Sequence, residues 1–322
     1  MNNENERDAH MKQLNIDKVK AITFSPFSEK GSLEGDAVKK SIDTAIEKIH
    51  INSILLAPVS MMKNAHVEDI DFTSDLTNSD EELFSIIDYM HEKGLAVFLK
   101  PTVNCLDGTW RAHINFFDKD VPCEPKWSNW FKSYTAFQSH FAGLAEKAGC
   151  ELFLPGCEMV NSDRREAEWR KLIDDLRQIY SGPIAYNCDK YQEDNVTWWD
   201  ACDYITSSGY YPIDKWSDEL DRIEKVVKKF NMPFFFAECG CMSTEGSSLI
   251  PNDWGLPGGI NLEEQAKWYE AMFTECNKRD FVKGHVLWSW TGKLYDMDEA
   301  KREKYYDIYL KPAMDVVAKY YK

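Results

Sequence analysis

The sequence predicts a single α/β domain folded as a (β/α)8 TIM barrel, and three observations support this. Short apolar segments alternate with amphipathic stretches along all 322 residues. Eight such apolar segments are found, which is the number of strands that closes a barrel of this class. Most are apolar on both faces, as expected of parallel strands covered by helices outside and by packed side chains inside. An open, doubly wound sheet is the alternative architecture for the same alternation.

The predicted strands are separated by segments with helical periodicity. The strands span residues 19–24, 53–59, 96–100, 152–156, 184–187, 204–208, 234–238 and 284–288. Between them, apolar residues recur at three- and four-residue spacing, as in Val38, Ile42, Ala45 and Ile49. This spacing predicts one buried face for each helix.

Local signals predict where some of these helices begin and which one is shortest. Ser79 followed by Glu82 has the pattern of a capping box, and Asn261 with Glu264 is a weaker example. Residues 194–201, in the fifth unit, are too few for an ordinary helix. We therefore expect a single turn there, with full helices in the other units.

No linker or low-complexity segment interrupts the series, so we expect one catalytic domain over residues 1–322, with residues 1–15 as a short N-terminal extension. The formal net charge of −16 opposes binding to nucleic acid and to anionic lipid surfaces. Apolar runs stay well short of the roughly 20 residues that span a bilayer. A neutral substrate is the easier partner, and no obligate protein partner is evident.

The nine cysteines bear on the cellular compartment. Because their number is odd, a fully paired set of disulfides is impossible. The first residues are polar and contain no apolar stretch of signal-peptide length. Together these features predict free thiols and a cytoplasmic protein.

The sequence favours neither a metal nor a cofactor. Cys239 and Cys241 form a C-x-C pair, but no second pair supplies the remaining ligands of a zinc site. The glycine-rich loop at residues 255–259 lacks the Gly-Lys-Ser/Thr of a phosphate-binding loop. We expect chemistry carried out by side chains alone.

Two glutamates follow predicted strands at the point where each apolar run stops. Glu158 comes after LFLPGC, and Glu238 comes directly after FFFA. Because barrel active sites lie at the carboxyl ends of the strands, the two carboxylates are expected to face each other across the barrel mouth. Hydrolysis of a glycosidic bond needs one protonated and one ionised carboxyl group, and a separation of about 5 to 5.5 Å gives retention of configuration. Alternatively, each glutamate caps a helix or pairs with a surface cation.

Aromatic residues at the last strand predict the other half of a sugar site. The apolar face of a pyranose stacks on an indole ring. Trp288 and Trp290 are two residues apart and are expected to share one face of the strand, with Trp288 as the platform beneath the cleaved sugar. The alternative is that one or both pack the barrel.

Further polar candidates follow other strands. Tyr210, after the sixth strand, is positioned to donate a hydrogen bond to Glu238 and keep it ionised. Asn187, Lys100, Trp110 and Arg111 are candidates for contacts with sugar hydroxyls. Arg111 could instead be a structural salt-bridge partner, and Lys100 could neutralise a buried carboxylate.

The order of these segments resembles clan A of the retaining glycoside hydrolases, and more closely glycoside hydrolase family 113, the β-mannanases. The residues that carry the resemblance cover nearly the whole chain: AITFSPF near the start, KPTVNCLDGTWRAHI at residues 100–114, GCEM around Glu158, FAECG around Glu238, and HVLWSW ending at Trp290. The resemblance implies that Glu158 is the acid/base and Glu238 the nucleophile. It also implies β-1,4-linked mannan or manno-oligosaccharides as the substrate.

One position departs from the clan. Many members carry an asparagine before the acid/base that contacts the sugar 2-hydroxyl, whereas this chain has Cys157. That contact is therefore expected to come from elsewhere or to be weaker. A clan A β-glycosidase for glucan, galactan or xylan, and a non-catalytic carbohydrate-binding barrel, are the alternative functions.

Two further expectations concern the form of the substrate. Because a polymer does not enter a cell, cytoplasmic residence predicts short manno-oligosaccharides as substrates. Residues 242–261 form a long insertion after Glu238 and contain Trp254. The insertion either closes one end of the substrate groove and favours action at chain ends, or is a passive surface excursion.

Overall fold

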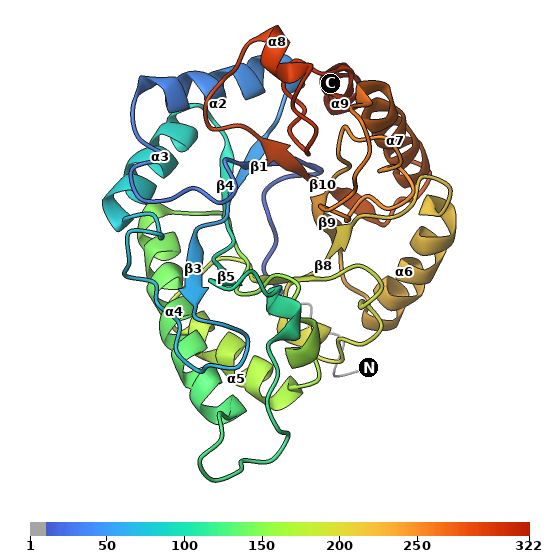
Figure 1. Cartoon of the computed structure of the whole chain (residues 1–322). Helices are drawn as coiled ribbons and strands as arrows, with labels where there is room; N and C mark the ends of the chain where they lie inside the picture. Colours follow the sequence, from blue (N-terminus) through green and yellow to red (C-terminus); the bar gives the residue numbers. More distant parts are fainter. Residues whose placement is uncertain (1–10) are drawn as a thin grey trace.

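The computed structural model describes residues 11–322. Most of the predicted N-terminal extension, residues 1–10, lies outside the described residues. Within the described chain, eight parallel strands form one sheet at the centre of the molecule (Figure 1). These strands are β1 (Val19–Phe24), β2 (Ser53–Leu56), β4 (Ala96–Leu99), β6 (Leu152–Phe153), β7 (Ala185–Cys188), β8 (Tyr204–Gly209), β9 (Phe234–Cys239) and β10 (Val282–Trp290).

The order of the strands shows that the sheet closes on itself. Hydrogen-bonded neighbours run β6-β4-β2-β1-β10-β9-β8-β7. The two outermost strands then meet through parallel bridges, one between Phe153 and Ile184 and one between Cys157 and Asn187. The barrel prediction is confirmed, and the open-sheet alternative is wrong.

Helices surround the strands, and each buries its apolar face against them (Figure 1). The main helices are α2 (Asp36–Ile49), α3 (Asp80–Glu92), α4 (Trp127–Ala148), α5 (Glu166–Arg177), α6 (Trp216–Phe230), α7 (Leu262–Cys276) and α9 (Pro312–Tyr321), with a short α8 (Met297–Ala300) before the last. The connection from β7 to β8 contains a single 3₁₀ turn, Trp199–Ala201, which confirms the predicted short fifth unit. Ser79 and Glu82 form the predicted capping box at the start of α3, and the Asn261 side chain caps α7.

A second, two-stranded parallel sheet at the barrel mouth was not predicted. It pairs β3 (Val59–Met62) with β5 (Thr102–Cys105). Pro58 and Pro101 each stand between a barrel strand and one of these short strands. Because proline has no backbone N–H, the barrel ladder stops there and pairing resumes beyond it. The predicted strand over residues 53–59 is therefore divided, and its continuation lines one side of the mouth.

A bulge in β9 determines which way its last side chains point. Phe235 and Ala237 face the inside of the barrel, whereas Phe236 packs against the helices. The pairing with β8 then shifts, so that Ser207 faces Phe236 but Ser208 faces Glu238. An extra residue in one strand interrupts the alternation of sides. Glu238 consequently points to the same side as Ala237, into the barrel mouth.

His285 is a buried histidine on the outer side of β10. Its ring stacks on Phe236 with 5.8 Å between centroids, and its Nε2 has no hydrogen-bond partner among residues 11–322. Burial, followed by the positive charge of Lys18, lowers the pKa of His285 to about 3. The folded protein therefore holds this imidazole in its neutral form.

This burial makes stability depend on pH. The unfolded chain binds a proton at this histidine below its ordinary pKa of about 6.5, whereas the folded state does so only near pH 3. Stability is therefore lost as the pH falls from about 6.5 towards 3. We expect the unfolding free energy of the wild type to fall between pH 7 and pH 4.5, and that of His285→Asn to fall by less. Urea denaturation at both pH values measures the difference.

A matched control is His50→Asn at an exposed helix end, where the left-handed backbone suits asparagine. In that variant, the unfolding free energy should change with pH as steeply as in the wild type. If the unfolding free energies of His285→Asn and the wild type change equally with pH, the pH dependence does not come from His285.

Candidate active site

A cavity of about 450 Å³ opens at the carboxyl ends of the barrel strands. It contains most of the side chains predicted from the sequence, which arrive from several strand ends. Six of the ten predicted site residues line it: Trp110, Arg111, Glu158, Tyr210, Glu238 and Trp288. Three more, Lys100, Cys157 and Asn187, are fully buried directly beneath these residues.

The backbone at Glu158 has a conformation that few residues other than glycine adopt. Glu158 has a φ of 54°, in the left-handed region, and its N–H donates to the carbonyl of Asn187 at 2.8 Å. Two residues earlier, a Cβ on Gly156 would lie 2.7 Å from the ring of Tyr186. Such a backbone costs about 1 to 3 kcal/mol and persists where the surrounding structure holds it, often at functional positions. This tight turn after β6 brings the Glu158 side chain into the cavity.

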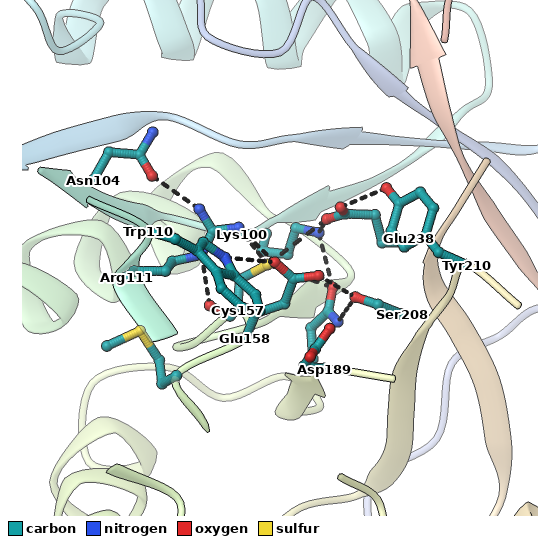
Figure 2. A network of polar contacts seen from close by, with 12 residues as sticks. Lys100, Asn104, Trp110, Arg111, Cys157, Glu158, Asp189, Ser208, Tyr210 and Glu238 are labelled. Atoms are coloured by element: carbon teal, nitrogen blue, oxygen red, sulfur yellow. Dashed lines mark hydrogen bonds and ion pairs between the residues drawn. The ribbon is translucent and has the colours of Figure 1, made fainter. Parts of the chain in front are cut away.

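Three donors surround the Glu158 carboxylate (Figure 2). The Ser208 hydroxyl donates to Oε1 at 2.8 Å, while the Arg111 guanidinium and the Trp110 indole donate to Oε2 at 3.2 and 3.3 Å. Arg111 also donates to the Cys157 carbonyl and to Asn104, each at 2.8 Å. Arg111 therefore connects Glu158 to the walls of the cavity. It forms the salt bridge that one of its two sequence interpretations proposed, and its partner is a carboxylate inside the site.

Glu238 has a different set of partners. The Lys100 ammonium donates to Oε2 at 2.8 Å, and the Tyr210 hydroxyl donates to Oε1 at 2.7 Å, which confirms the predicted Tyr210 contact. Burial by itself would raise the pKa of Glu238, but the charges of Lys100 and Arg111 and the two hydrogen bonds outweigh it and lower the pKa. Glu238 is held in its ionised form.

Lys100 and Asn187 join the two carboxylates through a continuous network, of which Figure 2 labels Lys100, Ser208 and both glutamates. Lys100 donates to Asn187 Oδ1 at 2.9 Å, and Asn187 Nδ2 donates to Ser208 at 3.0 Å, which in turn donates to Glu158. Although burial works to lower the pKa of Lys100, the anionic groups around it, Glu238 among them, raise the pKa above its usual value. Lys100 neutralises a buried carboxylate, as one of its two sequence interpretations proposed.

Cys157 lies behind both carboxylates. Its Sγ is 3.7 Å from Glu238 Oε2, 3.7 Å from Asn187 Oδ1 and 3.3 Å from an Arg111 nitrogen. Burial raises its pKa to about 12, so the thiol is neutral. Cys157 and Asn187 are at most 1% exposed. At Asn187 the predicted contact with a sugar hydroxyl is therefore replaced by contacts within the site, and Cys157 likewise contacts the groups around the carboxylates.

The two tryptophans at the end of β10 do not share a face, so this prediction is wrong. Trp288 lines the cavity, where its ring packs edge-on against Phe27 with 5.6 Å between centroids. Trp290 is fully buried outside the barrel and donates to Ser41 at 3.0 Å. A shift in the pairing of β1 with β10 between Ile22 and Phe24 adds a residue to β10 and reverses the alternation. Trp290 is a packing residue, whereas Trp288 lines the cavity.

Sequence reasoning missed several residues of the site. Ser208 lies near the end of β8 and Asp189 directly follows β7, so the search for polar residues at strand ends could have found both. Phe27, Tyr306 and Asn104 reach the cavity from loops and from the small sheet. No local pattern announces these three, because their positions depend on how distant segments pack.

Three further observations concern metal ligands, membrane-spanning helices and cysteines in the part of the chain that the structure describes. In residues 11–322, no group of three or more His, Cys, Asp or Glu side chains is arranged to hold a metal ion. None of the helices in this range is long and apolar enough to cross a membrane. All nine cysteines fall within it, none is in a disulfide, and only Cys123 is exposed.

A (β/α)8 barrel with two carboxylates in one cavity at its mouth defines the class of glycoside hydrolases that uses paired carboxyl groups. The chain also matches the sequence profile of Glycoside Hydrolase Family 113 over residues 22–311. It belongs to that family. A comparison with curated proteins found no match.

Solved structures agree with this family. A GH113 β-1,4-mannanase determined as a complex is 48% identical, with a TM-score of 0.94, and the match covers 95% of this chain and 99% of that one. The GH113 β-mannanase AaManA from Alicyclobacillus acidocaldarius, in complex with ManMIm, is 39% identical, with a TM-score of 0.91 and coverage of 95% and 98%. The Ruminococcus gnavus β-glucuronidase, at 14% identity and a TM-score of 0.66, shares the fold, and this chain spans 50% of its length.

The ionised state of Glu238 depends on its buried cation. We expect Lys100→Met to raise the pKa of Glu238, because burial would then act with less opposing charge. The measurement is a carbon NMR titration of protein labelled at the glutamate carboxyl carbons. Lys190→Met is the matched control, since Lys190 lines the same cavity but contacts Asp189. An unchanged Glu238 titration in Lys100→Met would contradict this account.

Proposed function

We propose that this chain hydrolyses β-1,4-mannosidic linkages with retention of configuration, with Glu158 as acid/base and Glu238 as nucleophile. One observation supports this assignment of roles most directly. Glu238 is held ionised by Lys100 and Tyr210, as a nucleophile requires, whereas Glu158 lies across the network from Glu238 with Ser208, Trp110 and Arg111 as its partners. The choice of sugar is supported by relatives described as β-1,4-mannanases at 39% and 48% identity.

The reaction follows from these positions in two steps. Glu238 attacks the anomeric carbon while Glu158 donates its proton to the glycosidic oxygen, and the leaving sugar departs with that proton. The product of this step is a glycosyl ester on Glu238. Glu158, now ionised, then removes a proton from water, which attacks the same carbon and releases Glu238. Two inversions restore the original configuration.

The surrounding residues have supporting roles in this proposal. Trp288 provides the apolar face on which the cleaved sugar stacks. Trp110 and Arg111 hold Glu158 in place, and their outer edges line the cavity within reach of sugar hydroxyls. Because Cys157 is buried behind the carboxylates, the contact that many clan members make to the 2-hydroxyl is assigned to neighbours such as Arg111.

The catalytic roles are tested by isosteric amides. We expect Glu158→Gln to lower kcat on mannohexaose by roughly 10²- to 10⁴-fold, the usual contribution of a general acid/base. Glu238→Gln should abolish turnover, because an amide cannot form the glycosyl ester. Product release is measured by anion-exchange chromatography.

A matched control is Glu245→Gln, an exposed glutamate in the loop after β9, which should retain wild-type rates. Proton NMR of the first-formed product should show the β-anomer. The proposal fails if the wild type releases no shorter oligomers, if both amide variants match it, or if the α-anomer forms first.

We further propose that the substrates are short manno-oligosaccharides in the cytoplasm, attacked near a chain end. Eight of the nine thiols are buried and unpaired, which is typical of proteins in a reducing compartment. The loop after β9 reaches the cavity with Asn252 and Trp254. The loop is tied down by a hydrogen bond from the Tyr306 hydroxyl to the Pro251 carbonyl at 2.5 Å and by Glu264, which accepts from two of its backbone amides. A fixed wall at one end of the cavity favours action at chain ends.

This substrate preference is measurable. We expect kcat/KM, per reducing end released, to be higher on mannotriose to mannohexaose than on polymeric mannan. A product profile on reducing-end-labelled mannohexaose should show one short product released repeatedly from one end. Faster cleavage of intact mannan, with products of all lengths from the start, would contradict the proposal.

A further inference from the structure

Asp189 is a carboxyl group in the cavity that the proposed mechanism does not use. It follows β7 and lines the cavity together with Glu158 (Figure 2). Its side chain is 9% exposed, so it is nine-tenths buried and what remains exposed faces the cavity. The group is therefore placed to meet a ligand rather than bulk solvent.

The protein leaves most of the hydrogen-bonding capacity of this carboxyl group unused. An ionised carboxylate has about four acceptor positions on its two oxygens. Within the described chain, its one side-chain partner is the adjacent Lys190, whose ammonium lies 3.4 Å from Oδ1. Glu158, by contrast, receives three hydrogen bonds, and Glu238 is held by Lys100 and Tyr210. The Lys190 backbone adds one further hydrogen bond to Asp189. A buried acceptor with few donors is costly, and a ligand that supplies more donors reduces that cost.

The electrostatics of Asp189 agree with this description. Burial, and then the negative charge of Glu158, raise the pKa of Asp189 to about 7. Lys190 opposes this rise through its charge and its hydrogen bonds but does not cancel it, so the carboxyl group remains short of donors. Hydroxyl groups of a bound ligand would supply those donors.

The position beside Glu158 indicates which part of a substrate would meet Asp189. As the acid, Glu158 must lie against the glycosidic oxygen, which belongs to the leaving sugar. In a 1,4-linkage this oxygen is flanked on the leaving sugar by the 3-hydroxyl and by the hydroxymethyl group at carbon 5. We propose that Asp189 binds the leaving-group sugar by accepting hydrogen bonds from these hydroxyls, which makes it a specificity-determining residue on the leaving-group side. This inference rests on the proposed function of Glu158 and Glu238.

The test compares two substrates that share their glycone. Mannotriose presents a mannose leaving group with hydroxyls, whereas phenyl β-mannobioside presents phenol, which needs a proton from Glu158 but has no hydroxyl to bind. We expect Asp189→Asn and Asp189→Ala to lower kcat/KM on mannotriose by about 10- to 100-fold, as for lost hydrogen bonds to a charged group. On phenyl β-mannobioside the change should stay within about threefold, the size of a minor surface effect.

The two substrates separate binding of the leaving sugar from an effect that acts through Glu158. An equal loss on both would overturn the inference, because it would show that Asp189 acts on proton transfer or on folding. No loss on mannotriose would also overturn it. Asp194→Asn, an exposed carboxylate of the same loop with 56% side-chain exposure, is the matched control and should leave both rates unchanged. If the wild type cleaves neither substrate, the proposed function fails, which is a different outcome.

Discussion

The buried ion pair between Lys100 and Glu238 is the interaction on which the rest of the site depends. Lys100 is fully buried, and its ammonium lies 2.8 Å from the Glu238 carboxylate. The pair joins the end of β4 to the end of β9, on opposite sides of the barrel. Removing one partner of such a pair leaves an uncompensated buried charge, at about 3 to 5 kcal/mol. The same ammonium holds Asn187, which orients Ser208 and through it Glu158.

This network gives the two carboxylates different environments, although both are glutamates at strand ends. Glu238 lies against a fixed positive charge and a phenol, whereas Glu158 is held by a hydroxyl, an indole and the edge of a guanidinium. For Glu238 this environment favours the ionised form. Cys157 fits this arrangement as a small neutral thiol between charged groups.

Particular residues show how far prediction from the sequence extends. The strand-end rule located Glu158, Glu238 and Tyr210, because apolar strands stop where the barrel mouth begins. It failed for Trp290, since a bulge in β10 reverses the alternation and no local pattern in the sequence marks it. The β3–β5 sheet was missed although Pro58 and Pro101 interrupt both segments, because short strands beyond a proline become stable only when they pair with each other. Asp189 directly follows β7, so the same rule could have located it, but its burial beside Glu158 is visible only in the tertiary structure.

By itself, the sequence determined the eight strands, several helix positions and the identity of the two carboxylates. These follow from periodicity and strand ends, which are local properties of the chain. Only the tertiary structure decided which side chains meet. The bulge that turns Glu238 inward, the burial of Lys100 beneath it and the loops that bring Phe27, Trp254 and Tyr306 together all depend on contacts between distant segments. Ionisation states belong to this second group, because burial and neighbouring charge exist only once the barrel has closed.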